Sequence, residues 1–250
     1  MVKKLLIVVV LMFSSGFAFA CSHLAMGIPK SSDHLFCGKG FAVGYNYQNR
    51  APDWVSYQLQ LKDQSPNALK DKTQKNYIFR TNQNIPLAYQ AEPEEFNGSN
   101  WYIAQLANPD TIEFSTLAKA QTFAMFGVVP VRSESAQALW LKLNQKEVHL
   151  FEKHSTLHVA SGGIYQTIDD YFGQNGIAVP SHLWKVFYLP ASNEAFAYLI
   201  PNHRDIINDN LQHYQVSIDE IEEKADINLL KRLDDEIEYV LESKKVVSLD

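Results

Sequence analysis

The stretch "VPSHLWKVFYLPASNEAFAYLIPN", residues 179–202, contains two largely apolar runs, 182–190 and 194–202. The short segment Ala191-Ser192-Asn193 lies between them. Apolar runs of this length, rich in aromatic and aliphatic residues and separated by turn residues, predict two strands joined as a β-hairpin. The stretch therefore places an antiparallel pair of strands in the C-terminal half of the chain.

Outside this hairpin, the sequence patterns predict both strands and helices, without a regular strand–helix–strand alternation. This mixture predicts an α+β fold with a central mixed or antiparallel sheet flanked by helices on both faces. The polar segment 64–76 is interpreted as a surface loop or short helix, and 82–100 as a loop. Strands are predicted at 41–48, 53–63, 77–81 and 155–165, and helices at 115–126, 133–147, 217–226 and 228–245.

The first 20 residues have the pattern of an export signal. Lys3 and Lys4 precede an apolar run, and Ala18-Phe19-Ala20 forms an A-x-A cleavage site. The apolar run is too short to span a membrane. We therefore expect a signal peptide at 1–20, a single domain at 21–250 that ends in a C-terminal helix at 228–250, no transmembrane segment in the mature chain, and a periplasmic or secreted protein.

The two cysteines of the chain are Cys21 and Cys37. In an exported protein, two cysteines favour a single disulfide. A lipoprotein signal also ends at a cysteine, so lipidation of Cys21 is the alternative. Ala18 stands where such signals usually carry leucine, and lipidation would leave Cys37 unpaired.

Composition and charge exclude several classes of function. The chain has 250 residues, 46% hydrophobic and 20% charged, and a net charge of −6, which becomes more negative without Lys3 and Lys4. This is ordinary globular composition and lacks the basic footprint of most nucleic-acid-binding proteins. The chain contains no P-loop, G-x-G-x-x-G, G-x-S-x-G, H-E-x-x-H or C-x-x-C motif. His154 and His158 have a spacing that suits a metal on a helix, but they fall in a predicted loop and strand.

Several segments, taken in order, resemble the DNA/RNA non-specific endonucleases, a family with a ββα-metal (His-Me finger) active site. The segments cover nearly the whole mature chain, and their order and spacing make the resemblance specific. They are "FCGKGFAVGYN" (36–46), "WVSYQL" (54–59), "QTFAMFGVVPV" (121–131), "HVASGGIY" (158–165), the hairpin at 179–202, and "VSIDEIEEKADINLLKRL" (216–233).

The central catalytic motif of that family, D-R-G-H-L-A-P, aligns with "YIAQLAN", residues 102–108. Tyr102 stands at the aspartate position, Ile103 at the arginine, Ala104 at the glycine and Gln105 at the histidine. In active relatives this histidine is the general base that takes a proton from water. A glutamine amide has no useful basicity, and losing general base catalysis costs about 10²–10⁴-fold in rate.

The resemblance also implies a metal-binding asparagine, and here the chain departs again. Gly127 replaces the asparagine of the "ETFxxxNxxPQ" segment, and Ala136 lies at the metal position, four residues before Trp140. Asn144 replaces the acid that follows this tryptophan. Because magnesium needs oxygen ligands, the resemblance assigns no catalytic or metal-binding residue in this chain, and we expect no cofactor.

Three hypotheses follow. The first is a non-catalytic member of the family that binds a protein or small molecule, with nucleic acid as a further partner that the sequence leaves open. The alternative is a divergent endonuclease or phosphodiesterase that uses Mg²⁺. It would recruit other residues, with Tyr102, Gln105, Asp110, Glu134 or Gln137 as the candidates. The third is a structural envelope protein that uses its acidic C-terminal helix to bind a partner.

Overall fold

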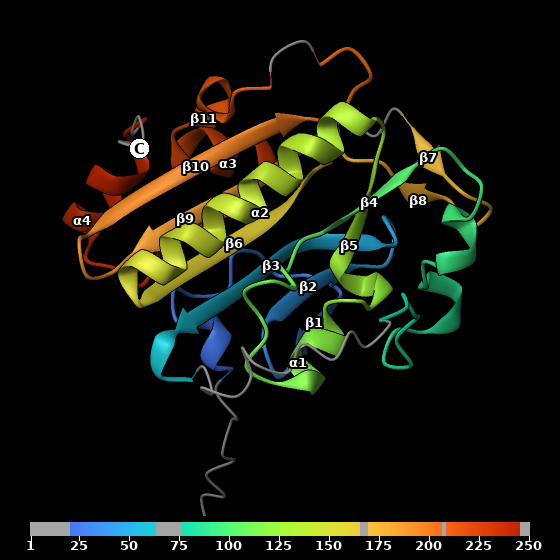
Figure 1. Cartoon of the computed structure of the whole chain (residues 1–250), viewed down its shortest axis with the longest axis horizontal. Helices are drawn as coiled ribbons and strands as arrows, with labels where there is room; N and C mark the ends of the chain where they lie inside the picture. Colours follow the sequence, from blue (N-terminus) through green and yellow to red (C-terminus); the bar gives the residue numbers. More distant parts are fainter. Residues whose placement is uncertain (1–20, 64–76, 166–169, 207–208, 246–250) are drawn as a thin grey trace, which may run out of the picture.

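A computed structural model describes residues 21–63, 77–165, 170–206 and 209–245 (Figure 1). The predicted signal peptide at 1–20 and the predicted loop or short helix at 64–76 lie outside these residues. Within the described ranges, no helix is both long and apolar enough to cross a membrane.

The centre of the fold is a seven-stranded sheet in the order β1-β2-β3-β6-β9-β10-β11, with every neighbouring pair antiparallel. The predicted hairpin at 179–202 is confirmed: β9 and β10 pair from Glu194 with Leu189 to Pro201 with His182. The strands of this sheet are β1 (His34–Cys37), β2 (Ala42–Asn46), β3 (Ala51–Gln60), β6 (Thr156–Ile164), β9 (His182–Leu189), β10 (Glu194–Pro201) and β11 (Gln215–Val216).

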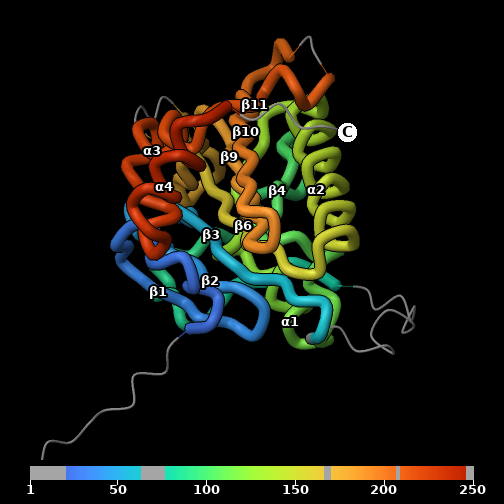
Figure 2. Tube along the Cα trace, turned by 90° about the vertical axis from the view of Figure 1, so that its left-hand side faces the viewer, coloured from blue at the N-terminus to red at the C-terminus, as the bar shows by residue number. Residues whose placement is uncertain are grey.

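Helices cover both faces of the sheet, as predicted. The long helix α2 (Glu134–His154) crosses one face, whereas α3 (Ile218–Ala225) and α4 (Asp235–Glu242) lie on the other (Figure 2). Side chains of β9 alternate between two cores. Phe187 packs in the core beneath α2, and Trp184 packs in the core that α3 and α4 close. Both faces of the central strands are therefore buried.

Two small sheets and one short helix complete the fold. The pair β4 (Tyr102–Gln105) and β5 (Val128–Val131) packs beside α2, and β7 (Tyr171–Phe172) pairs with β8 (Ile177–Ala178). Helix α1 (Thr116–Gln121) lies between β4 and β5 in the chain and is capped by the Ser115 side chain. With α2, the β4–β5 pair forms a ββα unit, as the family resemblance predicts.

Several sequence predictions differ from the structure. The strand predicted at 77–81 is wrong, since Arg80 makes only an isolated bridge to Ala124. The helix predicted at 228–245 is confined to Asp235–Glu242, because Asp234 supplies a new N-cap. The helix predicted at 115–126 is shorter, and continues after a break as a 3-10 turn at Met125–Gly127. The helix predicted at 133–147 runs on to His154.

The two cysteines form a disulfide, Cys21–Cys37, which joins the start of the described chain to β1. The disulfide predicted from the sequence is therefore present. His154 ends α2 whereas His158 lies in β6, so the pair does not share a helix.

Candidate functional site: a ββα motif without its catalytic side chains

The ββα unit is held together by local sequence signals. β4 and β5 pair antiparallel, with Tyr102 opposite Val131 and Gln105 opposite Val128. Helix α2 begins directly afterwards because the Ser133 hydroxyl accepts a hydrogen bond from the Ala136 backbone N–H at 3.2 Å, an N-cap contact. These contacts fix β4, which carries motif residues 102–105 and which we call the motif strand, against the first turns of α2.

Asn202, at the end of β10, ties this unit to the main sheet. Its amide donates to the Pro130 carbonyl at 3.1 Å and to the Pro180 carbonyl at 2.9 Å. Its carbonyl oxygen accepts from the Arg132 backbone N–H at 2.8 Å. One buried side chain thus joins β5, the segment before β9 and the end of β10, which positions the unit on a rigid support.

The three residues that begin the motif strand offer little acid–base chemistry. Tyr102 is partly exposed, at 39% of its full accessible surface. Ile103 packs against an apolar cluster that includes Phe96 and Val128. Ala104 is fully buried in the main core. The position that carries arginine in the family motif is therefore an aliphatic contact and cannot pair with a phosphate.

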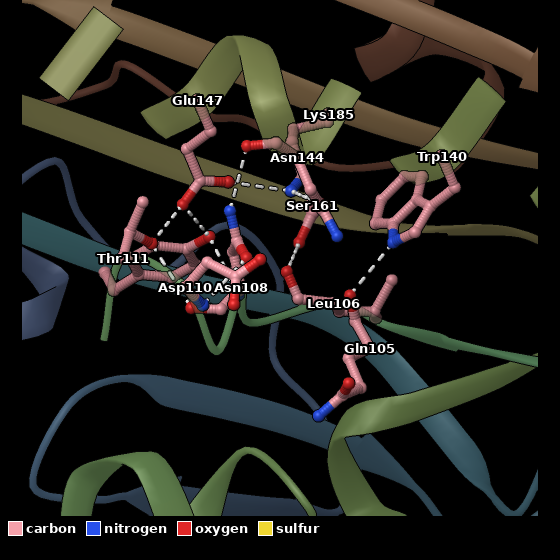
Figure 3. A network of polar contacts seen from close by, with 11 residues as sticks. Gln105, Leu106, Asn108, Asp110, Thr111, Trp140, Asn144, Glu147, Ser161 and Lys185 are labelled. Atoms are coloured by element: carbon pink, nitrogen blue, oxygen red, sulfur yellow. Dashed lines mark hydrogen bonds and ion pairs between the residues drawn. The ribbon is translucent and has the colours of Figure 1, made fainter. Parts of the chain in front are cut away.

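Gln105, at the general-base position, is engaged with the backbone. Its amide nitrogen donates to the Thr122 carbonyl at 2.9 Å. The backbone carbonyl of Gln105 accepts a hydrogen bond from the Trp140 indole N–H at 3.0 Å, which holds the strand against α2 (Figure 3). A glutamine oriented in this way holds the strand in place, and its amide cannot accept a proton near neutral pH.

The positions implied for metal binding carry no suitable ligand. Ala136 is 1% exposed and packs in the core. Gly127 is also buried, and its carbonyl accepts from the Leu106 backbone N–H at 3.0 Å. Gln137 uses its amide nitrogen on the Ile103 carbonyl at 3.1 Å. The residues present therefore do not fit the magnesium ion that the family resemblance implies.

The other acids of the divergent-enzyme hypothesis, Asp110 and Glu134, are exposed. Within the described ranges, neither belongs to a group of three carboxylate, histidine or cysteine ligands close enough to share a metal ion. The arginine that follows β5, Arg132, pairs with Asp170 at 2.6 Å and lies over the Trp101 ring, 5.0 Å from its centroid. Its charge is thus already partnered within the protein.

Helix α2 also carries a buried polar network, which we call the Glu147 network (Figure 3). Glu147 and Lys185 are both fully buried, and their charged groups pair at 2.8 Å. The other Glu147 oxygen accepts from the Tyr57 hydroxyl at 2.8 Å and from the Thr111 hydroxyl at 2.6 Å. Lys185 also donates to the Asn144 amide oxygen at 2.7 Å.

The network extends into the segment that follows the motif strand. The Asn108 backbone N–H donates to the Tyr57 hydroxyl at 3.3 Å, and its side-chain amide donates to the Asn144 carbonyl at 3.0 Å. Burial and the neighbouring Glu147 carboxylate hold the pKa of Tyr57 well above its usual range. Burial lowers the pKa of Lys185, while its contact with Glu147 opposes that shift. These bonds anchor the motif strand to the sheet, in an environment closed to solvent.

The sequence patterns did not identify Glu147 as a member of this network. A signal was available, because Glu147 follows Trp140 by seven residues and Leu143 by four. It therefore lies on the apolar stripe of the helix. A carboxylate on such a stripe requires a buried partner. The sequence does not show that the partner is a lysine on β9.

The architecture, a ββα unit packed on a large antiparallel sheet, is that of the ββα-metal nucleases. The chain matches the DNA/RNA non-specific endonucleases over residues 22–236, and it belongs to that family.

Individual relatives agree with this assignment. The mitochondrial nuclease EXOG of Homo sapiens is 26% identical over 224 residues, which cover 83% of this chain and 60% of the relative. A nuclease of Nostoc sp. is 22% identical over 242 residues, covering 89% of this chain and 85% of the relative. The chain thus spans only about three fifths of the human nuclease.

The fold is also shared with a solved structure. A chain in the crystal structure of the EndoG/EndoGI complex, which concerns the mechanism of EndoG inhibition, matches with a TM-score of 0.70 and 18% sequence identity. The match covers 85% of this chain and 91% of that one. It confirms the expected α+β fold of the ββα-metal nucleases.

Proposed function

We propose that this protein is a non-hydrolytic member of the endonuclease family and acts as a binding module. The observation that supports this most directly is Gln105, whose amide nitrogen is hydrogen-bonded to the Thr122 carbonyl at the place of the general base. Ala136 adds to it, since the metal position is a buried methyl group. A phosphodiester hydrolase of this type needs a general base and a metal cation. Here the base position carries an amide, and the cation position carries no oxygen ligand.

The surface beside the motif strand favours a protein or small molecule over a phosphate chain. Trp101 packs against Phe172, with ring centroids 5.1 Å apart, and the exposed Tyr102 follows it in the chain. The nearby guanidinium of Arg132 is neutralised by Asp170. Aromatic side chains with a paired charge are typical of protein-binding surfaces, whereas phosphate recognition requires free cations.

We also propose that the protein is exported to the periplasm or the cell exterior, with residues 1–20 as the signal peptide. The Cys21–Cys37 disulfide supports this, since structural disulfides persist in oxidising compartments. Because the Cys21 sulfur is held in this disulfide, we favour the disulfide over lipidation of Cys21.

The proposed function is tested by nuclease assays on single- and double-stranded DNA and on RNA, with Mg²⁺ and with Mn²⁺. The purified protein is compared with Gln105→His, with Gln105→His/Ala136→Asn, and with Gln105→Ala prepared in the same way. We expect no metal-dependent cleavage by the wild type or by Gln105→His, because a restored imidazole still lacks the cation ligand.

Cleavage by the wild type at a rate that Gln105→Ala reduces would overturn the proposal. That result would favour the divergent Mg²⁺-dependent nuclease. Equal cleavage by the wild type and Gln105→Ala is assigned by adding Asp110→Asn/Glu134→Gln: a rate that also survives in this variant comes from a contaminating nuclease, whereas a rate that falls would overturn the proposal. Circular dichroism of each variant checks that it is folded.

A further inference from the structure

On the face of the sheet opposite α2, three carboxylates gather between α3 and α4. They belong to Asp219 and Glu222 of α3 and to Glu242, the last residue of α4. One carboxylate oxygen from each lies within 4.8 Å of the others. Asp219 and Glu222 are three residues apart, so they share a helix face, and that face is turned toward the end of α4.

Glu242 is the member of this group that burial makes unusual. Its side chain is only 7% exposed, and its Oε1 has no hydrogen-bond partner among the described residues. It lies beside Leu241, which packs in the core closed by α3 and α4. An unpaired polar group buried in this way is costly unless something else satisfies it.

The surroundings make a lone negative charge at Glu242 still less favourable. The charges that act on it most are other carboxylates: Glu222, Glu238 and Asp219. Burial, followed by these charges, raises the pKa of Glu242 to about 8. The C-terminal end of a helix also carries a partial negative charge, and the last turn of α4 has no basic residue.

None of the three carboxylates forms a salt bridge within the described residues. Glu222 accepts a hydrogen bond from the Leu229 backbone N–H at 2.6 Å, to its Oε1. Its side chain is also hydrogen-bonded to the Glu242 carboxyl group. The group therefore presents several carboxylate oxygens from two helices, at separations that a single ion can bridge.

We propose that Asp219, Glu222 and Glu242 form a binding site for a divalent cation of the calcium type, which clips α4 onto α3. Calcium is bound by oxygens at about 2.3–2.6 Å, so two of its ligands are at most about 5 Å apart, as the geometry here requires. The exposure of Asp219 leaves room for water in the remaining coordination positions. Magnesium demands a stricter octahedron and fits two flexible glutamates less well. The site is separate from the ββα unit, on the other face of the sheet.

The test is calorimetric titration of the chelator-treated protein with CaCl₂ at pH 8, together with thermal unfolding. We expect one calcium ion per chain and a rise in melting temperature of about 5 °C at a calcium concentration roughly 100-fold above Kd. Glu242→Gln removes the buried charge and should abolish both signals. In chelator, this variant should melt no lower than the wild type. Asp219→Asn, at an exposed position, should weaken binding about tenfold.

The matched control is Glu236→Gln, which removes an exposed carboxylate from the same helix outside the group. It should keep the full calcium response. Wild-type protein that binds none of Ca²⁺, Mg²⁺ and Mn²⁺ at millimolar concentration would overturn the proposal and leave Glu222 and Glu242 sharing a proton. A calcium response that survives in both Glu242→Gln and Asp219→Asn would place the cation elsewhere and overturn it as well.

Discussion

Helix α2 takes part in two polar environments that differ in what they can do. Near its N-terminus, Ala136 and the neighbouring Gln105 stand at positions where the family carries a metal ligand and a base. Near its C-terminus, Glu147 pairs with Lys185 and accepts hydrogen bonds from Tyr57 and Thr111. The first region, which we call the motif site, retains its backbone framework without titratable chemistry. The second, the Glu147 network, retains charged groups that have no access to solvent.

The difference separates the scaffold of this family from its chemistry. A buried ion pair cannot lose one member without leaving an unpaired charge, so the Glu147 network resists substitution. Gln105 and Ala136, at the base and metal positions of the family motif, carry no charge, so a substitution there leaves no buried charge unpaired. The stability of the fold therefore depends more strongly on the Glu147 network than on the motif site.

The comparison is tested most severely by Lys185→Met. This substitution leaves the Glu147 carboxylate buried without its cation, and we expect a loss of about 3–5 kcal/mol in the free energy of unfolding, measured with urea. The double variant Lys185→Met/Glu147→Gln should lose less than the single one, since no charge remains buried. A single variant as stable as the wild type would contradict the structural role of the network.

Unlike Lys185, which is buried with a charged partner, His158 is a buried ionisable group whose burial favours its neutral form. His158 of β6 is 9% exposed, and burial lowers its pKa to about 4. The unfolded chain, with an ordinary pKa of about 6.5, therefore binds more protons than the folded protein between these pH values. Stability should fall by roughly 3 kcal/mol as pH drops from 7 to 4 because of this residue.

Denaturation with urea at several pH values measures this effect. His158→Gln should flatten the acid limb of the profile, whereas His149→Gln, at an exposed position on α2, should leave it unchanged. Equal profiles for His158→Gln and the wild type would show that His158 becomes protonated without cost.

The smallest expected effect is at the motif site. Gln105→Ala removes the hydrogen bond to the Thr122 carbonyl, and we expect a loss of about 1 kcal/mol in unfolding free energy. Gln145→Ala, an exposed glutamine of α2, is the matched control and should change stability by a few tenths of a kcal/mol at most. A Gln105→Ala loss as large as that of Lys185→Met would remove the distinction between the two regions.

Much of the fold could be predicted from local patterns. The hairpin of β9 and β10, the pair β2 and β3, and the start of α2 follow from apolar runs, turn residues and an N-cap serine. The short strands β1, β4 and β5 were missed, because strands of four residues carry too little periodicity to identify. The strand predicted at 77–81 failed for a related reason: its apolar residues find no neighbouring strand.

The sequence by itself determined which side chains stand at the catalytic positions of the family motif, since Ile103, Gln105 and Ala136 have fixed chemistry wherever they lie. It also indicated the class of fold and favoured a disulfide between the two cysteines. Only the tertiary structure decided the environment of the charged groups. Glu147 and Glu242 are both buried glutamates on helices, but one meets a lysine and two hydroxyls from distant strands and loops, and the other meets carboxylates. The reason is physical: the free energy of a buried charge depends on partners brought together by folding, which no local pattern records.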